Sequence, residues 1–308
     1  MHHYQQTLSI LGDLEFSHGA NLTTLRYLGL SQERIGTIFE LQSNFKKALE
    51  SYQESLSIRQ RLVREKPAHY DMNRDLAIAF EKIADIHQRT GNNAAALESY
   101  HKSLAIFERL ASKDPENTNA QRSLSFSYEH TAHALEAQGQ FAHATSYYEK
   151  ALRIRQDLRK NDPMNRKDRS DLGGTLFRLA DLSARQGNVG AAERYSRKLL
   201  QLQQEQADNP QATVFDLNNY AWSLLTCQPV ALRDPALALE YANKAVKMPQ
   251  GEAPNILDTL ALAYFMNGHL ERAVETEEKA LSLVPANSPM RHDIESNLRR
   301  FLSAIEEK

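Results

Sequence analysis

The sequence predicts an all-α protein built as a solenoid of antiparallel helix pairs, and three observations lead to this fold class. A unit of 48 residues occurs four times without gaps, beginning at Ile35, Ile83, Thr131 and Leu179. Internal repetition at a fixed period of this size is typical of solenoids. Within each copy, apolar residues recur at helical spacing. The chain also has only 12 glycines and 10 prolines in 308 residues. Together they make up a smaller fraction of the chain than the roughly 12% that these two residues contribute to an average protein.

Each column of the repeat keeps one kind of side chain. Two columns hold small residues, one is mainly aromatic and two are aliphatic. In that order, the columns are Gly36, Ala84, Ala132, Ala180; Ala48, Ala96, Ala144, Ala192; Tyr52, Tyr100, Tyr148, Ser196; Leu56, Leu104, Leu152, Leu200; and Ile58, Ile106, Ile154, Leu202. A turn such as Thr90–Asn93, in which Gly91 suits the end of a helix, divides each copy into two helices. A proline follows the second helix at Pro67, Pro115 and Pro163.

This order of small, small, aromatic and aliphatic columns before a proline resembles the tetratricopeptide repeat, a helix–turn–helix unit of about 34 residues. The most regular copy lies at Ile256–Asn287. It carries Ala261, Tyr264, Gly268, Ala273, Ala280 and Pro285 at the family's positions. The resemblance implies a right-handed superhelix whose first helices line a concave face, where peptides or partner helices dock.

The four 48-residue copies are longer than the family's unit by about 14 residues, or about four helical turns. Shared between two helices, this length adds two turns to each without rotating the apolar stripe. We therefore expect helices of about 20 residues. Further leucine columns in the added turns support helix over loop, namely Leu62, Leu110, Leu158 and Leu28, Leu76, Leu124, Leu172.

Comparison with the family's repeat unit also divides the chain into five expected segments. Residues 1–20 predict the second helix of a partial repeat, and residues 21–211 hold the extended units. Residues 212–249 form a distorted unit with a longer turn, and residues 250–287 form a standard unit. Residues 288–308 predict a capping helix, with Ser288 as its N-cap and one apolar stripe. That stripe consists of Ile294, Leu298, Leu302 and Ile305.

Composition disfavours several classes of protein. The net charge of −2 does not suit a generic nucleic-acid binder or a polybasic membrane-surface protein. No apolar run approaches the roughly 18 residues of a membrane span, and the N-terminus lacks the pattern of a signal peptide. The single cysteine excludes an intrachain disulfide. We expect a soluble, cytoplasmic protein.

No catalytic constellation stands out. Residues 73–76 resemble part of a kinase catalytic loop, but the preceding histidine is absent. His130 and His133 could share a helix face, yet no third metal ligand is evident. Cys227 has no histidine partner in the sequence, which favours a structural role. We therefore expect no enzymatic activity, no metal and no cofactor.

The concave face offers the candidate site, on which a protein or peptide partner would bind. An acidic column, Glu33, Glu81 and Glu129, runs beside a largely basic one. The candidate partner-binding residues are Glu33, Arg34, Thr37, Glu81, Lys82, Asp85, Gln88, Glu129, His130, His133, Arg178 and Asp181. Glu33 and Thr37 stand where the family's carboxylate clamp has lysine and asparagine, so we expect no capture of a C-terminal carboxylate. The simpler interpretation is that these charges only keep the array soluble.

Three functional hypotheses follow. The first is a protein-interaction scaffold. The second is a regulatory region, because the extended units followed by the segment from Asn218 resemble the C-terminal part of some bacterial serine/threonine protein kinases. The third is self-assembly into a homo-oligomer through the partial N-terminal repeat. The reading frame upstream of Met1 would test the second hypothesis, and sedimentation would test the third.

Overall fold

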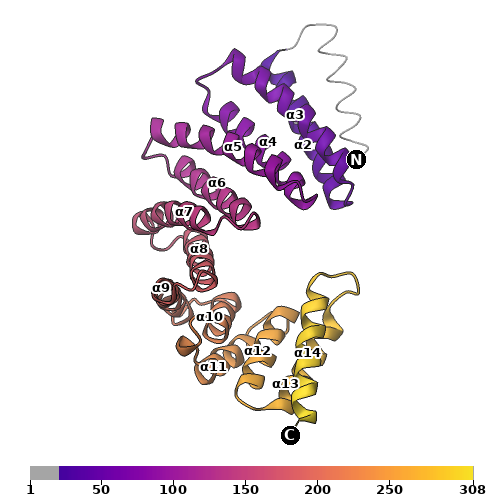
Figure 1. The fold of residues 1–308 in the computed structure, drawn as a ribbon, viewed down its shortest axis with the longest axis vertical. Helices are drawn as coiled ribbons and strands as arrows, with labels where there is room; N and C mark the ends of the chain where they lie inside the picture. The colour runs from indigo at the N-terminus through magenta and orange to yellow at the C-terminus, as the bar shows by residue number, and fades with distance from the viewer. Residues whose placement is uncertain (1–20, 308) are drawn as a thin grey trace. The chain divides into compact units, whose positions relative to one another are not determined.

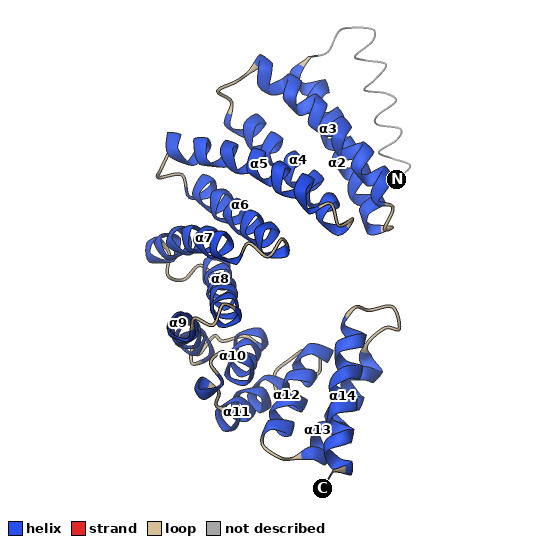
Figure 2. Ribbon diagram, in the orientation of Figure 1, coloured by secondary structure: helices blue, strands red, loops and turns tan. Residues whose placement is uncertain are grey.

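A computed structural model describes residues 21–307 of the chain. Every regular element in this part is a helix, and none of its residues forms a strand (Figure 2). The chain divides into two compact units, residues 1–164 and 165–308. The fold class predicted from the repeats is therefore confirmed. The partial repeat expected over residues 1–20 lies outside the described residues.

The described helices of the first unit form three antiparallel pairs that follow one another along the chain (Figure 1). The pairs are α2 (Leu22–Leu41) with α3 (Phe45–Glu65), α4 (Tyr70–Arg89) with α5 (Asn93–Lys113), and α6 (Thr118–Ala137) with α7 (Phe141–Asn161). Each of these helices has 20 or 21 residues. The expected length of about 20 residues is thus correct.

The second unit begins with one more pair of long helices and continues with shorter ones. Its elements are α8 (Arg166–Arg185), α9 (Val189–Ala207), α10 (Val214–Thr226), η1 (Val230–Leu232), α11 (Pro235–Val246), α12 (Pro254–Met266), α13 (Leu270–Leu283) and α14 (Met290–Glu306). The helices α10 to α13 have only 12 to 14 residues. The change from long to short helices falls between α9 and α10, which have 19 and 13 residues.

Asparagine and glycine set the helix ends at the same places in successive copies. Six of the long helices begin after an asparagine whose side chain accepts a hydrogen bond from a backbone N–H of the first turn. The turns between paired helices contain a residue at positive φ, and this residue is glycine at Gly91, Gly139 and Gly187. In the first copy Ser43 takes this conformation, with φ of 58°. These local devices explain why the helices recur at a constant spacing.

Small residues let the paired helices of the first unit approach closely. Ala48, Ala96 and Ala144 are fully buried. The tyrosines Tyr52 and Tyr148 are also buried, with 1% and 0% of their surface exposed. A side chain at Gly36 would lie only 2.7 Å from the ring of Tyr52. The small and aromatic columns are therefore core positions.

In the second unit, aromatic rings connect α10 with α11 and α12 with α14. Tyr220 and Tyr241 meet edge to face at 4.8 Å between centroids, and Phe265 stacks on Phe301 at 4.6 Å. The 3₁₀ helix η1 lies between α10 and α11. No described helix is both long and apolar enough to cross a membrane.

The C-terminal helix differs in detail from the expectation. Helix α14 begins at Met290 after Pro289, and no side chain caps it, so Ser288 is not its N-cap. Phe301 is fully buried, whereas Leu302 is 42% exposed. One residue corresponds to about 100° around a helix, and the aromatic stack on Phe265 places Phe301 inward. The predicted stripe is therefore wrong at Leu302, although Ile294 is buried as expected.

Candidate functional site

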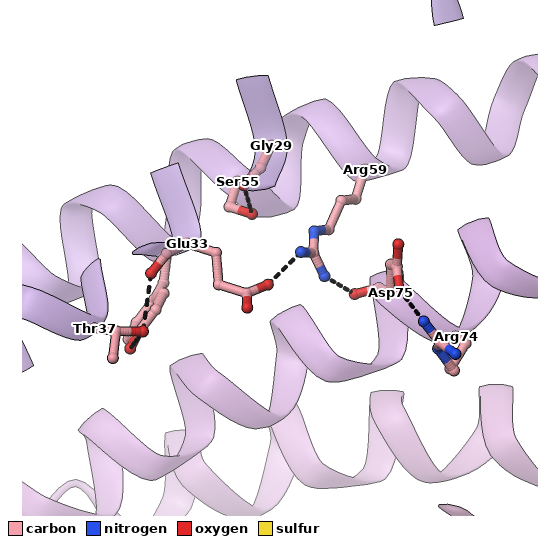
Figure 3. Close-up of polar contacts among 8 residues, drawn as sticks. Gly29, Glu33, Thr37, Ser55, Arg59, Arg74 and Asp75 are labelled. Carbon is pink, nitrogen blue, oxygen red and sulfur yellow. Dashed lines mark hydrogen bonds and ion pairs between the residues drawn. The ribbon is translucent and has the colours of Figure 1, made fainter. Parts of the chain in front are cut away.

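The candidate surface of the first unit is formed by its first helices, α2, α4 and α6. We call it the first-helix surface and define it by Arg34, Thr37, Lys82, Gln88 and His133, together with the acidic column. Its most regular feature is that side chains of the second helices bind the carboxylates of the acidic column. Figure 3 shows this arrangement in the first copy.

Glu33 forms an ion pair with Arg59, which comes from α3 and is only 5% exposed. The same guanidinium donates to the backbone carbonyl of Asp75 on α4, so one arginine connects three helices (Figure 3). Thr37 donates to the carbonyl of Glu33 at 3.0 Å, within helix α2. Glu33 is consequently a structural partner, with 14% of its side chain exposed.

The third copy repeats the pair. Arg155 on α7 donates to Glu129 on α6, with Nη1–Oε1 and Nη2–Oε2 distances of 3.1 and 2.7 Å. Phe126 lies 4.8 Å from the guanidinium carbon of Arg155 and covers it. Two parallel bonds to a carboxylate make the strongest kind of ion pair, and Arg155 is 2% exposed.

The second copy has Phe107 where the other two have arginine. Glu81 instead accepts a hydrogen bond from Ser103 at 3.1 Å, and His130 lies 3.6 Å away. Burial alone would lower the pKa of His130. The pairing with Glu81 and the nearby charges of Asp85 and Glu129 outweigh burial and raise that pKa above its ordinary value. All three acidic residues of the column therefore have partners within the array.

Side chains of the tyrosine column form hydrogen bonds with residues of the same surface. Tyr100 donates to Asp85 at 2.6 Å and contacts the side-chain oxygen of Gln88 at 3.2 Å. Burial raises the pKa of the Asp85 carboxyl, against the hydrogen bond from Tyr100 and the charges of His130 and Lys82. His133 is exposed and meets Gln88 at 3.0 Å. Asp85 and Gln88 thus face Tyr100 and are tied to the core.

Cationic side chains remain the more available part of this surface. Arg34 is exposed and forms no ion pair with another described residue, and Lys82 is half-buried. Arg178 and Asp181 belong to the second unit, on α8. Arg178 is exposed, and Asp181 lies 3.7 Å from Arg185. The acids of the column are therefore paired within the array, whereas Arg34 and Arg178 are exposed.

Sequence reasoning missed Arg59 and Arg155. The signal that could have found them is periodicity, since they lie 96 residues apart in a column that also contains Phe107. A charge that recurs at a buried position indicates a buried partner. The expected absence of a metal site remains a prediction. Among residues 21–307, no group of three or more histidine, cysteine, aspartate or glutamate side chains is suitably placed for a metal ion.

The fold and this surface define a helical repeat protein. Residues 76–116 and 127–162 match the model of the tetratricopeptide repeat. These two stretches of the first unit are therefore tetratricopeptide repeats, as their columns predict.

Solved structures resemble the fold at low sequence identity. BtubC from P. vanneervenii is 18% identical, and the match covers 79% of this chain and 96% of that one, with a TM-score of 0.55. A signal transduction ATPase with numerous domains and a tetratricopeptide repeat sensor, from Pyrococcus horikoshii, is 15% identical. That match covers 91% of this chain and 39% of the ATPase, with a TM-score of 0.54. The apo form of RapI is 14% identical over 97% of this chain and 99% of its own, with a TM-score of 0.50.

None of the curated proteins matches the sequence. The resemblance to the kinase region is not confirmed by the family match or by the solved structures above. These likenesses concern the fold, and the function of the chain has to be argued from its own side chains.

Proposed function

We propose that this chain is a protein-interaction scaffold that holds a segment of a partner protein on its first-helix surface. The observation that carries the proposal is the unequal use of charge on that surface. The carboxylates of Glu33, Glu81 and Glu129 are paired within the array, whereas Arg34 extends into solvent beside them. A partner segment would accordingly meet cations rather than free acids.

Tetratricopeptide repeats support this proposal because stacked helix pairs create extended surfaces that suit a partner chain. The rigid setting of the surface supports it too. Tyr100 fixes Asp85, and Arg155 fixes Glu129, so the polar groups are already in place before a partner arrives. Binding to such a preorganised surface costs less conformational entropy.

A photocrosslinking experiment in cells tests the proposal. A photoreactive amino acid placed at Arg34 or Lys82 should form adducts with a protein partner. The same amino acid at Lys46, an exposed residue of the second helix α3, is the matched control. Adducts that form equally from Lys46, or that form from none of the three positions, would contradict the proposal.

Charge reversal then checks the identified partner. Arg34→Glu with Lys82→Glu should weaken its binding by about tenfold or more, since each reversal replaces attraction by repulsion. Lys46→Glu with Arg153→Glu, at exposed positions of α3 and α7, should leave binding unchanged. Reversal of Glu129 is unsuitable because it removes the partner of a buried arginine.

A further inference from the structure

A groove of about 400 Å³ lies in the second unit between the first helices α8 and α10, and α9 also lines it. Figure 1 shows these three helices as neighbours. The volume falls within the range of about 300–1,000 Å³ typical of ligand pockets. The groove is separate from the first-helix surface described above. All of its lining residues lie between Arg166 and Ser223.

The groove arises where long helices give way to short ones. The small column places Ala180 of α8 level with Ala221 of α10. Helix α8 begins fourteen residues before Ala180, but α10 begins only seven before Ala221. Helix α10 is therefore shorter at this end by about two turns, or about 10 Å. The first turns of α8 consequently have no counterpart on α10.

The side chains in this copy also depart from the columns. Gly174 stands where the other copies have Leu30, Ile78 and Phe126. A Cβ atom added at Gly174 would meet nothing within 4 Å. The missing side chain thus leaves open space at the centre of α8.

The buried ion pair of the first and third copies is replaced as well. Phe177 takes the position of the glutamate, and Gln203 takes the position of the arginine. Gln206 occupies the column of Leu62, Leu110 and Leu158. A polar side chain at an otherwise apolar column position normally needs a partner.

Those partners are not supplied by the described residues. The buried Oε1 atom of Gln203, the Nε2 atom of Gln206 and the Nε atom of Arg169 form no hydrogen bond to them. All three residues line the groove. One acceptor and one donor on neighbouring glutamines match the N–H and C=O groups of a peptide backbone.

The charges in the groove are complementary to an acid. Neither Arg166 nor Arg169 forms an ion pair with another described residue. The carboxylate of Asp216, which also lines the groove, is occupied by Thr213, whose backbone N–H and hydroxyl donate to it at 2.8 and 2.6 Å. Apolar surface is available further along, where Phe177 is 37% exposed and Phe215 is 52% exposed.

We infer that this groove binds an extended segment of a partner protein, which presents a carboxylate to Arg169 and Arg166 and a large apolar side chain to Phe177, Phe215 and Trp222. The inference rests on the proposed scaffold function and assigns a second, specific binding site to it. Eight residues of α8 separate Arg169 from Phe177, a distance of about 12 Å. This corresponds to about three or four residues of extended chain. The acidic and apolar side chains of the segment should be that far apart.

A random peptide display library selected on the intact protein tests the inference. Enriched peptides should carry an Asp or Glu and a large apolar residue at the stated spacing. Trp222 is the only tryptophan of the chain and lines the groove. Its fluorescence can therefore report the binding of each synthesised peptide without a label. Replacing the acid of the peptide by its amide should weaken binding by about tenfold, since charge-assisted bonds are lost.

Two glycine substitutions serve as a matched pair. Gly174→Leu restores the kind of side chain found in the other copies and should abolish binding by filling the groove. Gly190→Leu adds the same side chain at an exposed position of α9, where it also meets nothing within 4 Å, and should leave binding unchanged. Circular dichroism and urea unfolding should show both variants folded.

Three outcomes would overturn the inference. They are no enriched peptide, enriched peptides without an acidic residue, and peptides that bind the Gly174→Leu variant as well as the unaltered protein. Each of these results is measured on purified protein and reports on the groove formed by α8 to α10. The crosslinks from Arg34 and Lys82 are measured separately in the first unit, so failure of the groove and failure of the scaffold function are distinguishable.

Discussion

Arg155 and Glu129 form a bidentate ion pair in which the two partners are buried to different degrees. The arginine is 2% exposed, whereas 24% of the glutamate side chain is exposed. This asymmetry predicts that the two single substitutions are unequal. Glu129→Leu leaves a buried positive charge without its partner and should lower the free energy of unfolding by about 3–5 kcal/mol. Arg155→Met leaves a partly hydrated carboxylate and should cost about 1–2 kcal/mol.

Urea unfolding monitored by circular dichroism measures both values. The second copy supplies the control, because it has Phe107 at the position of the buried arginine and Glu81 accepts a hydrogen bond from Ser103 instead. Glu81→Leu should therefore cost clearly less than Glu129→Leu. Equal losses at the two glutamates would show that Arg155 does not depend on its partner.

Ser43 predicts a stabilising substitution. It has φ of 58°, a left-handed conformation that the equivalent Gly91 adopts at 79°. Side chains with a Cβ atom are strained there. Ser43→Gly should raise the free energy of unfolding by about 1 kcal/mol, and Gly91→Ser should lower it by a similar amount. Two changes of the same sign in urea unfolding would refute this interpretation of the turn.

Glu277 predicts a pH dependence of stability. It is fully buried on α13, and burial with the nearby charge of Asp258 raises its pKa from 4.5 to about 9. Asp293 and Arg300 of α14 also act on this pair. The folded state keeps the proton of Glu277 over a range in which the unfolded state has lost it. Stability should therefore fall as pH rises from about 4.5 towards about 9.

Glu277→Gln removes this ionisation and should make the protein more stable at pH 7, by about 1–3 kcal/mol. It should also flatten the dependence of the melting temperature on pH. Glu275→Gln, at an exposed position of the same helix, is the control and should change neither quantity. A pH profile that Glu277→Gln leaves unchanged would exclude Glu277 as its source.

Cys227 should be chemically inert in the folded protein. It is 4% exposed, and burial raises the pKa of its thiol, although the charge of Arg233 opposes this. Because reaction requires a local opening and a thiolate, modification by a disulfide reagent should be roughly a hundredfold slower than in urea. The chain has a single cysteine, so the signal belongs to it alone. Modification at the unfolded rate would contradict a buried, structural role.

The helices were predictable because they depend on local signals. Asparagine caps, glycine turns and apolar stripes repeat every 48 residues, and each acts within a few positions of the chain. The error at Leu302 has a different origin. Leu302 and Phe301 are both apolar neighbours on α14, and only the ring of Phe265 decides which one faces inward.

The candidate site was predictable only in part. The positions of Glu33, Glu81 and Glu129 on one face follow from the period. The partners of these glutamates do not follow from the period, because Arg59 and Arg155 lie 26 residues further along the chain on another helix. Charge columns in a sequence do not distinguish a free surface acid from one that neutralises a buried arginine.

The sequence by itself determined the repeat, the lengths of the helices and the places where they turn, since these depend on the local pattern of side chains. Only the tertiary structure decided which charges are paired, that Glu277 is buried, and that the step between α8 and α10 opens a groove at Gly174. The physical reason is that burial and pairing depend on what the neighbouring helices place against a residue, and those helices are distant in sequence.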